Sequence, residues 1–227
     1  MRALVALVAL LALAQLAAAG PIALLASDGS TPLVGARIVA EKLDGERVEL
    51  TVPPDGSVTV REVPLGILKI TVVSWKGVPI NYQCVVTPLN ATVVVPKVHR
   101  LVVSVVGSRG QGLGGAAVEV LYEGRTVERG VADGAGNYAT LLPAASYVVR
   151  AEYGGKRAER RVDLAAPDRV VLQLDVFAEI GGVALSSSEV MGLIALAALV
   201  PLILFVVAYE YAQWRKKRML KVVAGPQ

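Results

Sequence analysis

The stretch that decides the fold is Pro32-Leu33-Val34-Gly35-Ala36-Arg37-Ile38, because a second version of it follows 80 positions later as Gly112-Leu113-Gly114-Gly115-Ala116-Ala117-Val118. The leucine, the Gly-Ala pair and the final aliphatic residue coincide. Gly56 and Gly136 keep the same register. A register kept over so many positions indicates a duplicated module. We expect the copies at residues 21–97 and 98–176, each long enough for one small domain.

Each copy carries the signals of β-strands. Tyr147, Val149, Ala151 and Tyr153 recur at every second position, which is the period of a half-buried strand. Turn pairs separate the hydrophobic runs. They are Asp28-Gly29, Asp44-Gly45, Asp55-Gly56, Glu123-Gly124, Asp133-Gly134 and Gly154-Gly155. The spacing predicts an all-β protein: two tandem seven-stranded, Ig-like or transthyretin-like β-sandwiches, with an N-terminal signal helix and one C-terminal transmembrane helix.

The two copies share a longer order of motifs. The first copy has the quoted 32–38 stretch, then Asp55-Gly56-Ser57-Val58, then Val63-Pro64-Leu65-Gly66-Ile67-Leu68. The second copy follows the same order but has Ala145 where the first has Gly66. These motifs resemble those of the carboxypeptidase regulatory-like domain. The resemblance implies a transthyretin-like β-sandwich close to the Cna-B and PEGA-type surface modules. It implies no cofactor and no catalytic residue, because the shared motifs are turn and core residues that specify a fold rather than an activity.

The sequence of the C-terminal part of the chain predicts a membrane anchor. Residues 190–209 carry no charge, and at about 1.5 Å per residue they span a hydrocarbon core of about 30 Å. We expect a transmembrane helix over 189–211, opened by a capping box at residues 186–189. Pro201 lies within it, as a harmless kink or as a packing notch for a partner helix.

A basic cytoplasmic tail is expected over 212–227, because Arg and Lys beside a span are retained inside the cell. Aromatic rings favour the lipid headgroup level. The predicted membrane-interface anchors are Tyr209, Tyr211, Trp214, Arg215, Lys216, Lys217 and Arg218. The sequence therefore predicts a type I single-pass protein of the plasma membrane, with its N-terminal domains outside the cell.

The N-terminal segment supports export. Residues 1–19 combine one early Arg, an Ala/Leu/Val run and a small-residue end, which is typical of a cleaved signal peptide. The alternative is an uncleaved N-terminal anchor, and under either alternative the two copies are exported. Between the second copy and the anchor, residues 177–188 contain Gly181-Gly182 and three serines, so we expect a flexible stalk there.

Charge and cysteine content restrict the function. The net charge is +4, but most of the excess lies in the tail, so the outer part is nearly neutral and nucleic-acid binding is not expected. The run 156–161 is a candidate basic patch or, as we expect, the solvated face of a strand. Cys84 is the only cysteine, so no internal disulfide forms, and we expect a buried thiol in a strand.

No residue pattern points to catalysis, a cofactor or a metal. His99 is the only histidine and lies at the joint between the copies, where a solvated side chain is expected. Residues 133–137 offer too few oxygen ligands for calcium and read as a turn. Asn90-Ala91-Thr92 is a sequon, so Asn90 is either glycosylated after export or unmodified by chance.

These observations favour a non-enzymatic, membrane-anchored cell-surface protein that presents two β-sandwich modules for binding, envelope or adhesion interactions. Its expected partners are membrane lipid and another protein or a surface glycan. The alternative is an accessory single-span subunit of a larger membrane complex, such as a transporter, secretion or envelope assembly, that is contacted through the helix with Pro201. An enzyme is the remaining alternative, and no acid/base motif supports it.

Overall fold

The structure is a computed structural model that describes residues 20–61, 63, 67–87 and 91–223, and side chains as far as residue 216. The strands of the first copy are β1 (Ile22–Leu25), β2 (Arg37–Lys42), β3 (Arg47–Thr51), β4 (Ser57–Val58), β5 (Leu68–Trp75), β6 (Val78–Val86) and β7 (Thr92–Val94). Those of the second are β8 (Val98–Val106), β9 (Ala117–Tyr122), β10 (Arg125–Val131), β11 (Asn137–Pro143), β12 (Ser146–Tyr153), β13 (Lys156–Asp163) and β14 (Asp168–Gln173). A hairpin, β15 (Ala178–Ile180) and β16 (Val183–Leu185), and helix α2 (Ser187–Val223) complete the chain.

Both copies build a three-stranded and a four-stranded sheet with the same strand order. The first copy has β4-β1-β7 and β3-β2-β5-β6, and the second has β11-β8-β14 and β10-β9-β12-β13. In each copy the first and last strands pair in parallel and the other pairs are antiparallel. The prediction of an all-β protein with two seven-stranded sandwiches and a C-terminal helix is thus confirmed.

Each copy has its own hydrophobic core. Along β5 and β12 the side chains are buried at every second position at the start of the strand, as the period of two requires. The largest fully buried side chains are Ile22, Leu24, Leu33, Ile38, Leu68 and Ile70 in the first copy, and Leu101, Leu142, Tyr147, Leu164 and Leu174 in the second. The predicted turns lie between the strands as expected.

The shared Gly-Ala motif has the same geometry in both copies. Gly35 and Gly115 have φ angles of 76° and 83°, a left-handed conformation that glycine adopts without steric cost. The backbone N–H of Gly35 donates to the carbonyl of Val52 at 2.8 Å, and that of Gly115 donates to Ala132 at 2.9 Å. The glycines that repeat in the sequence therefore make equivalent backbone hydrogen bonds in the two copies.

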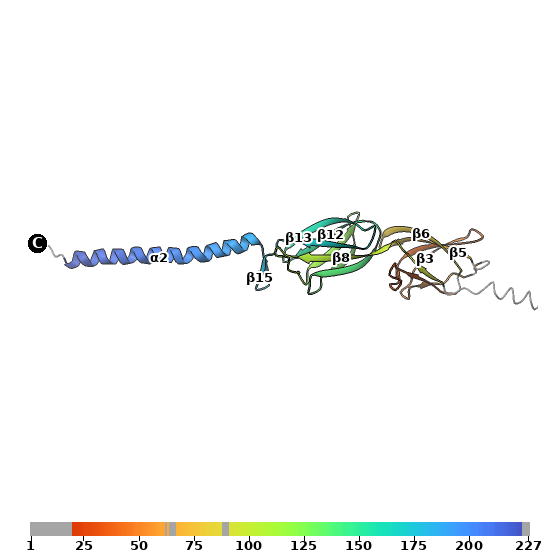
Figure 1. The fold of residues 1–227 in the computed structure, drawn as a ribbon, viewed down its shortest axis with the longest axis horizontal. Helices are drawn as coiled ribbons and strands as arrows, with labels where there is room; N and C mark the ends of the chain where they lie inside the picture. Colours follow the sequence, from red (N-terminus) through yellow and green to blue (C-terminus); the bar gives the residue numbers. More distant parts are fainter. Residues whose placement is uncertain (1–19, 62, 64–66, 88–90, 224–227) are drawn as a thin grey trace, which may run out of the picture.

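The two sandwiches lie end to end and share contacts at their joint (Figure 1). Val98 begins β8 but packs in the first core, whereas Val78, beside the β5–β6 turn, packs in the second. Lys76 in that turn pairs with Glu128 of the second sandwich and donates to the carbonyl of Leu141 at 3.2 Å. Because each core takes a residue from the other copy, the joint resists bending.

An open cavity of about 620 Å³ lies at the joint. Asp28 lines it from the first sandwich, and Arg100 and Thr140 line it from the second. Hydrogen bonds from the Thr31 hydroxyl and from the backbone N–H groups of Thr31 and Ser30 hold the pKa of Asp28 well below its usual range. The joint thus presents a concave surface built by both copies, with the charged side chains of Asp28 and Arg100 among apolar neighbours.

Two expectations differ from the structure. Cys84 is half-buried rather than buried, although partial burial still raises the pKa of its thiol. In place of a flexible stalk, residues 178–185 form the β15–β16 hairpin, because the two glycines supply its turn at φ angles of 60° and 82°. The candidate patch at 156–161 lies on strand β13, where the side chains of Arg157, Glu159, Arg160 and Arg161 are exposed, as expected for a solvated face.

Replacing Tyr147 with Phe is expected to lower the free energy of unfolding by about 1 kcal/mol near neutral pH. The Tyr147 side chain is 1% exposed, and its hydroxyl donates to the carbonyl of Pro143 at 2.7 Å. Urea unfolding of the full chain in detergent micelles, followed by circular dichroism, measures the difference.

The free energies of unfolding of the unchanged protein and of the Tyr147→Phe variant should converge at high pH. Burial raises the pKa of Tyr147 above its usual value. The neutral phenol stabilises the fold below the unfolded-state pKa of about 10, and this contribution is lost as the pH rises toward the folded-state value. The phenylalanine variant lacks the ionisation. A stability difference that stays constant between pH 7 and 11 would contradict this assignment.

Candidate functional site: a membrane anchor and its junction with the second sandwich

Helix α2 is long and apolar enough to cross a membrane. The candidate span is Ser187–Lys216, 30 residues, and none of its apolar window is buried within the protein. Large side chains such as Leu196, Leu199 and Phe205 are 56%, 51% and 68% exposed. A helix that is hydrophobic all round needs an apolar environment. Because the described part of the protein supplies none, a lipid environment fits the helix best.

The helix is longer than the predicted 189–211. It begins at Ser187 and continues without a break through Pro201 to Val223, so the first part of the expected tail is helical. Residues 212–223 are mostly Ala, Gln, Arg, Lys, Met and Leu, which favour helix, and the first Gly and Pro come only at 225 and 226. At about 1.5 Å per residue the helix is about 55 Å long and extends beyond a hydrocarbon core of about 30 Å.

The predicted interface residues lie together on the last described turns of the helix. Tyr209, Tyr211 and Trp214 are each at least half exposed, and the Tyr211 and Trp214 rings are 6.1 Å apart. Arg215 and Lys216 come next, also exposed. Lys217 and Arg218 are in the helix, but their side chains lie outside the described residues. This aromatic-then-basic order suits the boundary between hydrocarbon and headgroups.

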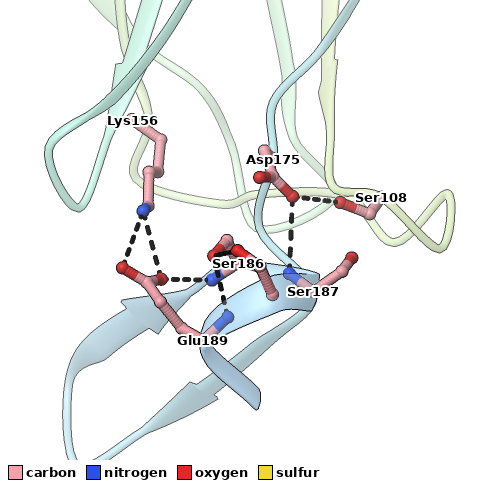
Figure 2. A network of polar contacts seen from close by, with 7 residues as sticks. Ser108, Lys156, Asp175, Ser186, Ser187 and Glu189 are labelled. Carbon is pink, nitrogen blue, oxygen red and sulfur yellow. Dashed lines mark hydrogen bonds and ion pairs between the residues drawn. The ribbon is translucent and has the colours of Figure 1, made fainter. Parts of the chain in front are cut away.

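The predicted capping box opens the helix. The backbone N–H of Glu189 donates to the Ser186 hydroxyl oxygen at 3.2 Å, and the N–H of Ser186 donates to the Glu189 carboxylate at 2.6 Å. These reciprocal bonds satisfy two N–H groups that have no partner inside the helix (Figure 2).

A second set of contacts ties this cap to the second sandwich. Lys156, at the start of β13, lies 3.1 Å and 3.2 Å from the two carboxylate oxygens of Glu189. Asp175 accepts a hydrogen bond from the Ser108 hydroxyl at 3.2 Å and a long one from the backbone N–H of Ser187 at 3.5 Å. Figure 2 shows that the contacts of Lys156 and of Asp175 both meet the first turn of α2. The start of the helix is therefore attached to the sandwich by two side chains, Lys156 and Asp175, and Ser108 holds the second of them.

Sequence reasoning identified the capping box but not these partners. Lys156 is 33 positions from Glu189, and only the fold brings them together. One signal was available: an ionisable side chain at the edge of a membrane span often pairs with a group of opposite charge. Of the other singled-out residues, His99 lies half-buried in β8 opposite Leu142. Asn90, the candidate glycosylation site, and the signal segment 1–19 lie outside the described residues.

Replacing Ser186 with Ala should destabilise the first turn of α2 by about 1 kcal/mol, because the Glu189 N–H loses its acceptor. Amide hydrogen exchange of the full chain in lipid nanodiscs should show about fivefold faster exchange at residues 188–190. Ser187→Ala is the matched control, because among the described residues no hydrogen bond of the Ser187 hydroxyl is found. Equal exchange in the two variants would show that the cap does not hold the turn.

Comparison with models of known protein families finds no match, and no curated protein matches the sequence. The expected membership in the carboxypeptidase regulatory-like family therefore stays a prediction.

Several solved structures are similar to this chain at low identity. The Bacillus anthracis TIE protein is 15% identical, with a TM-score of 0.31, and the match covers 69% of this chain and 33% of that one. The minor pilin of Streptococcus agalactiae is 13% identical, with a TM-score of 0.31 and coverages of 71% and 98%. The 5-hydroxyisourate hydrolase of Klebsiella pneumoniae is 20% identical, with a TM-score of 0.26 and coverages of 33% and 86%. The chain thus spans about a third of the first of these proteins, and TM-scores this low decide neither fold nor function.

Proposed function

We propose that this protein is a non-enzymatic surface protein, anchored in the plasma membrane by α2, that presents its two β-sandwiches outside the cell to another protein or to a surface glycan. The observation that supports this most directly is α2 itself, an apolar helix that no described part of the protein covers. The basic cluster after the helix favours a cytoplasmic tail. The capped and tethered start of the helix then lies at the outer surface.

The arrangement supports a role in presentation. The sandwiches continue away from the helix in a row, so the first one is held farthest from the membrane (Figure 1). The interlocked joint limits bending between them, and the junction at Glu189 and Asp175 limits bending at the membrane. We propose the cavity at the joint as the partner-binding surface, because it is concave, built by both copies, and lined by apolar residues with a few charged and polar groups. Arg100 lines it and makes no ion pair with the described residues, so an acidic group on the partner would suit it.

A photo-crosslinking experiment in the cells that make the protein tests this function. Benzoylphenylalanine is introduced as Ala139→benzoylphenylalanine, at an exposed position lining the cavity, or as Leu202→benzoylphenylalanine, at a 59% exposed position on α2. The proposal predicts a discrete extracellular adduct from position 139 and only lipid adducts from position 202. A stoichiometric membrane-protein adduct from position 202, with none from 139, would favour the accessory-subunit alternative instead.

A further inference from the structure

The β15–β16 hairpin exposes two aliphatic side chains at its tip. Ile180 and Val183 face each other across the turn and are 62% and 59% exposed. Gly181 and Gly182 form the turn between them, so the tip is small and carries no charge. Large apolar side chains left in water at the end of a protruding hairpin indicate a contact surface.

The base of this hairpin is fixed to the second sandwich. Ala184 is only 6% exposed and packs in the second core. It lies so close to Gly154 that a Cβ at position 154 would meet the Ala184 Cβ at 2.4 Å. The Tyr153 hydroxyl donates to the Glu179 carboxylate at 2.7 Å. These contacts keep the hairpin extended from the sandwich, so its tip does not fold back to cover its own apolar side chains.

The hairpin lies where the helix would enter the bilayer. Only Ser186 separates β16 from α2, and the uncharged run begins four residues later, at Val190. At about 1.5 Å per residue this places the hydrocarbon boundary about 6 Å from the base of the hairpin. In Figure 1, β15 lies between the second sandwich and α2. The base of the hairpin therefore lies at about the level of a lipid headgroup layer.

We propose that the tip of the β15–β16 hairpin inserts Ile180 and Val183 into the headgroup layer of the outer leaflet, beside α2. This inference rests on the proposed function, since it requires that α2 span the membrane. Two contacts with one bilayer, the helix and the hairpin, fix the tilt of the sandwiches where a helix alone would not. The partner is the lipid surface itself, recognised by an uncharged apolar tip.

The test uses the full chain in phosphatidylcholine–phosphatidylglycerol vesicles that contain lipids with a nitroxide on the acyl chain. In a Cys84→Ser background, an environment-sensitive nitrobenzoxadiazole label is attached to Ile180→Cys, to Leu43→Cys or to Leu199→Cys. Leu43 is the matched control: it is 58% exposed in the β2–β3 turn, at the end of the first sandwich away from the joint. Leu199 reports on the span itself.

The inference predicts blue-shifted emission at position 180 and quenching at least about twofold stronger than at position 43. Adding Val183→Asp should reduce the quenching at 180, because the native tip, rather than the label, drives insertion. If the label at position 199 is quenched while the label at position 180 is quenched no more than the one at position 43, the proposed hairpin contact is wrong, and the membrane span is supported. If the label at position 199 is not quenched, α2 does not span the membrane, and the hairpin contact, which depends on that span, is wrong as well.

Discussion

Replacing Leu196 and Leu202 together with Arg is expected to release the protein from membranes. Both side chains lie on the uncharged run of α2 and are 56% and 59% exposed, so neither packs on protein that could shelter a charge. An Arg near the centre of a span costs about 2.5–3.5 kcal/mol, whereas each large aliphatic residue contributes only about 0.3–0.6 kcal/mol. Two arginines therefore offset most of the apolar gain of the span.

Liposome flotation measures this effect on purified chain that begins at Gly20, so that the N-terminal segment cannot serve as a second anchor. The unchanged chain should float with the liposomes and the double variant should stay at the bottom of the gradient. Ala212→Arg with Gln213→Arg adds the same charges beyond the uncharged run and should float normally. Flotation of the Leu196→Arg, Leu202→Arg variant would show that α2 is not the membrane-binding element.

Gly136→Ala is expected to destabilise the second sandwich by about 2–4 kcal/mol. Gly136 has a φ of 81°, which costs any other residue about 1–2 kcal/mol. A Cβ there would also lie 2.4 Å from the carbonyl oxygen of Val105 and 2.7 Å from the backbone nitrogen of Leu113. Both are backbone atoms, so the clash is relieved only by moving strands.

Gly134 provides the matched control in the same turn. A Cβ there meets nothing within 4 Å, and its φ is not left-handed. Gly134→Ala should therefore change stability by less than about 0.5 kcal/mol. Thermal unfolding of the full chain in micelles should show the Gly136→Ala variant melting about 10–20 °C lower than the control. Equal melting temperatures would refute the requirement for glycine at position 136.

The sequence predicted the sandwiches because backbone requirements leave a trace in residue identity. Gly56 and Gly136 occupy the same left-handed position in the two copies, at φ angles of 76° and 81°. The buried and exposed positions of β12 alternate as its sequence does. Turn and core positions are local constraints, so a single sequence reveals them.

The junction could not be predicted in the same way. The strands of the β15–β16 hairpin have three residues each, too few for a period to show, and the glycines and serines beside them resemble a linker. Burial of Ala184 and the pairing of Lys156 with Glu189 depend on distant segments. The continuation of α2 beyond residue 211 could not be predicted from the basic residues, because Arg and Lys are found both in cytoplasmic tails and in helices.

Lysine labelling of intact cells tests most directly whether α2 carries the sandwiches outside and the basic end inside. A membrane-impermeant amine reagent is applied, and labelled peptides are identified by mass spectrometry. Lys69, whose side chain is 45% exposed on the first sandwich, should be labelled at once, and Lys216 only after the membrane is opened. Labelling of Lys216 on intact cells with Lys69 protected would contradict the proposed orientation and, with it, the proposed function.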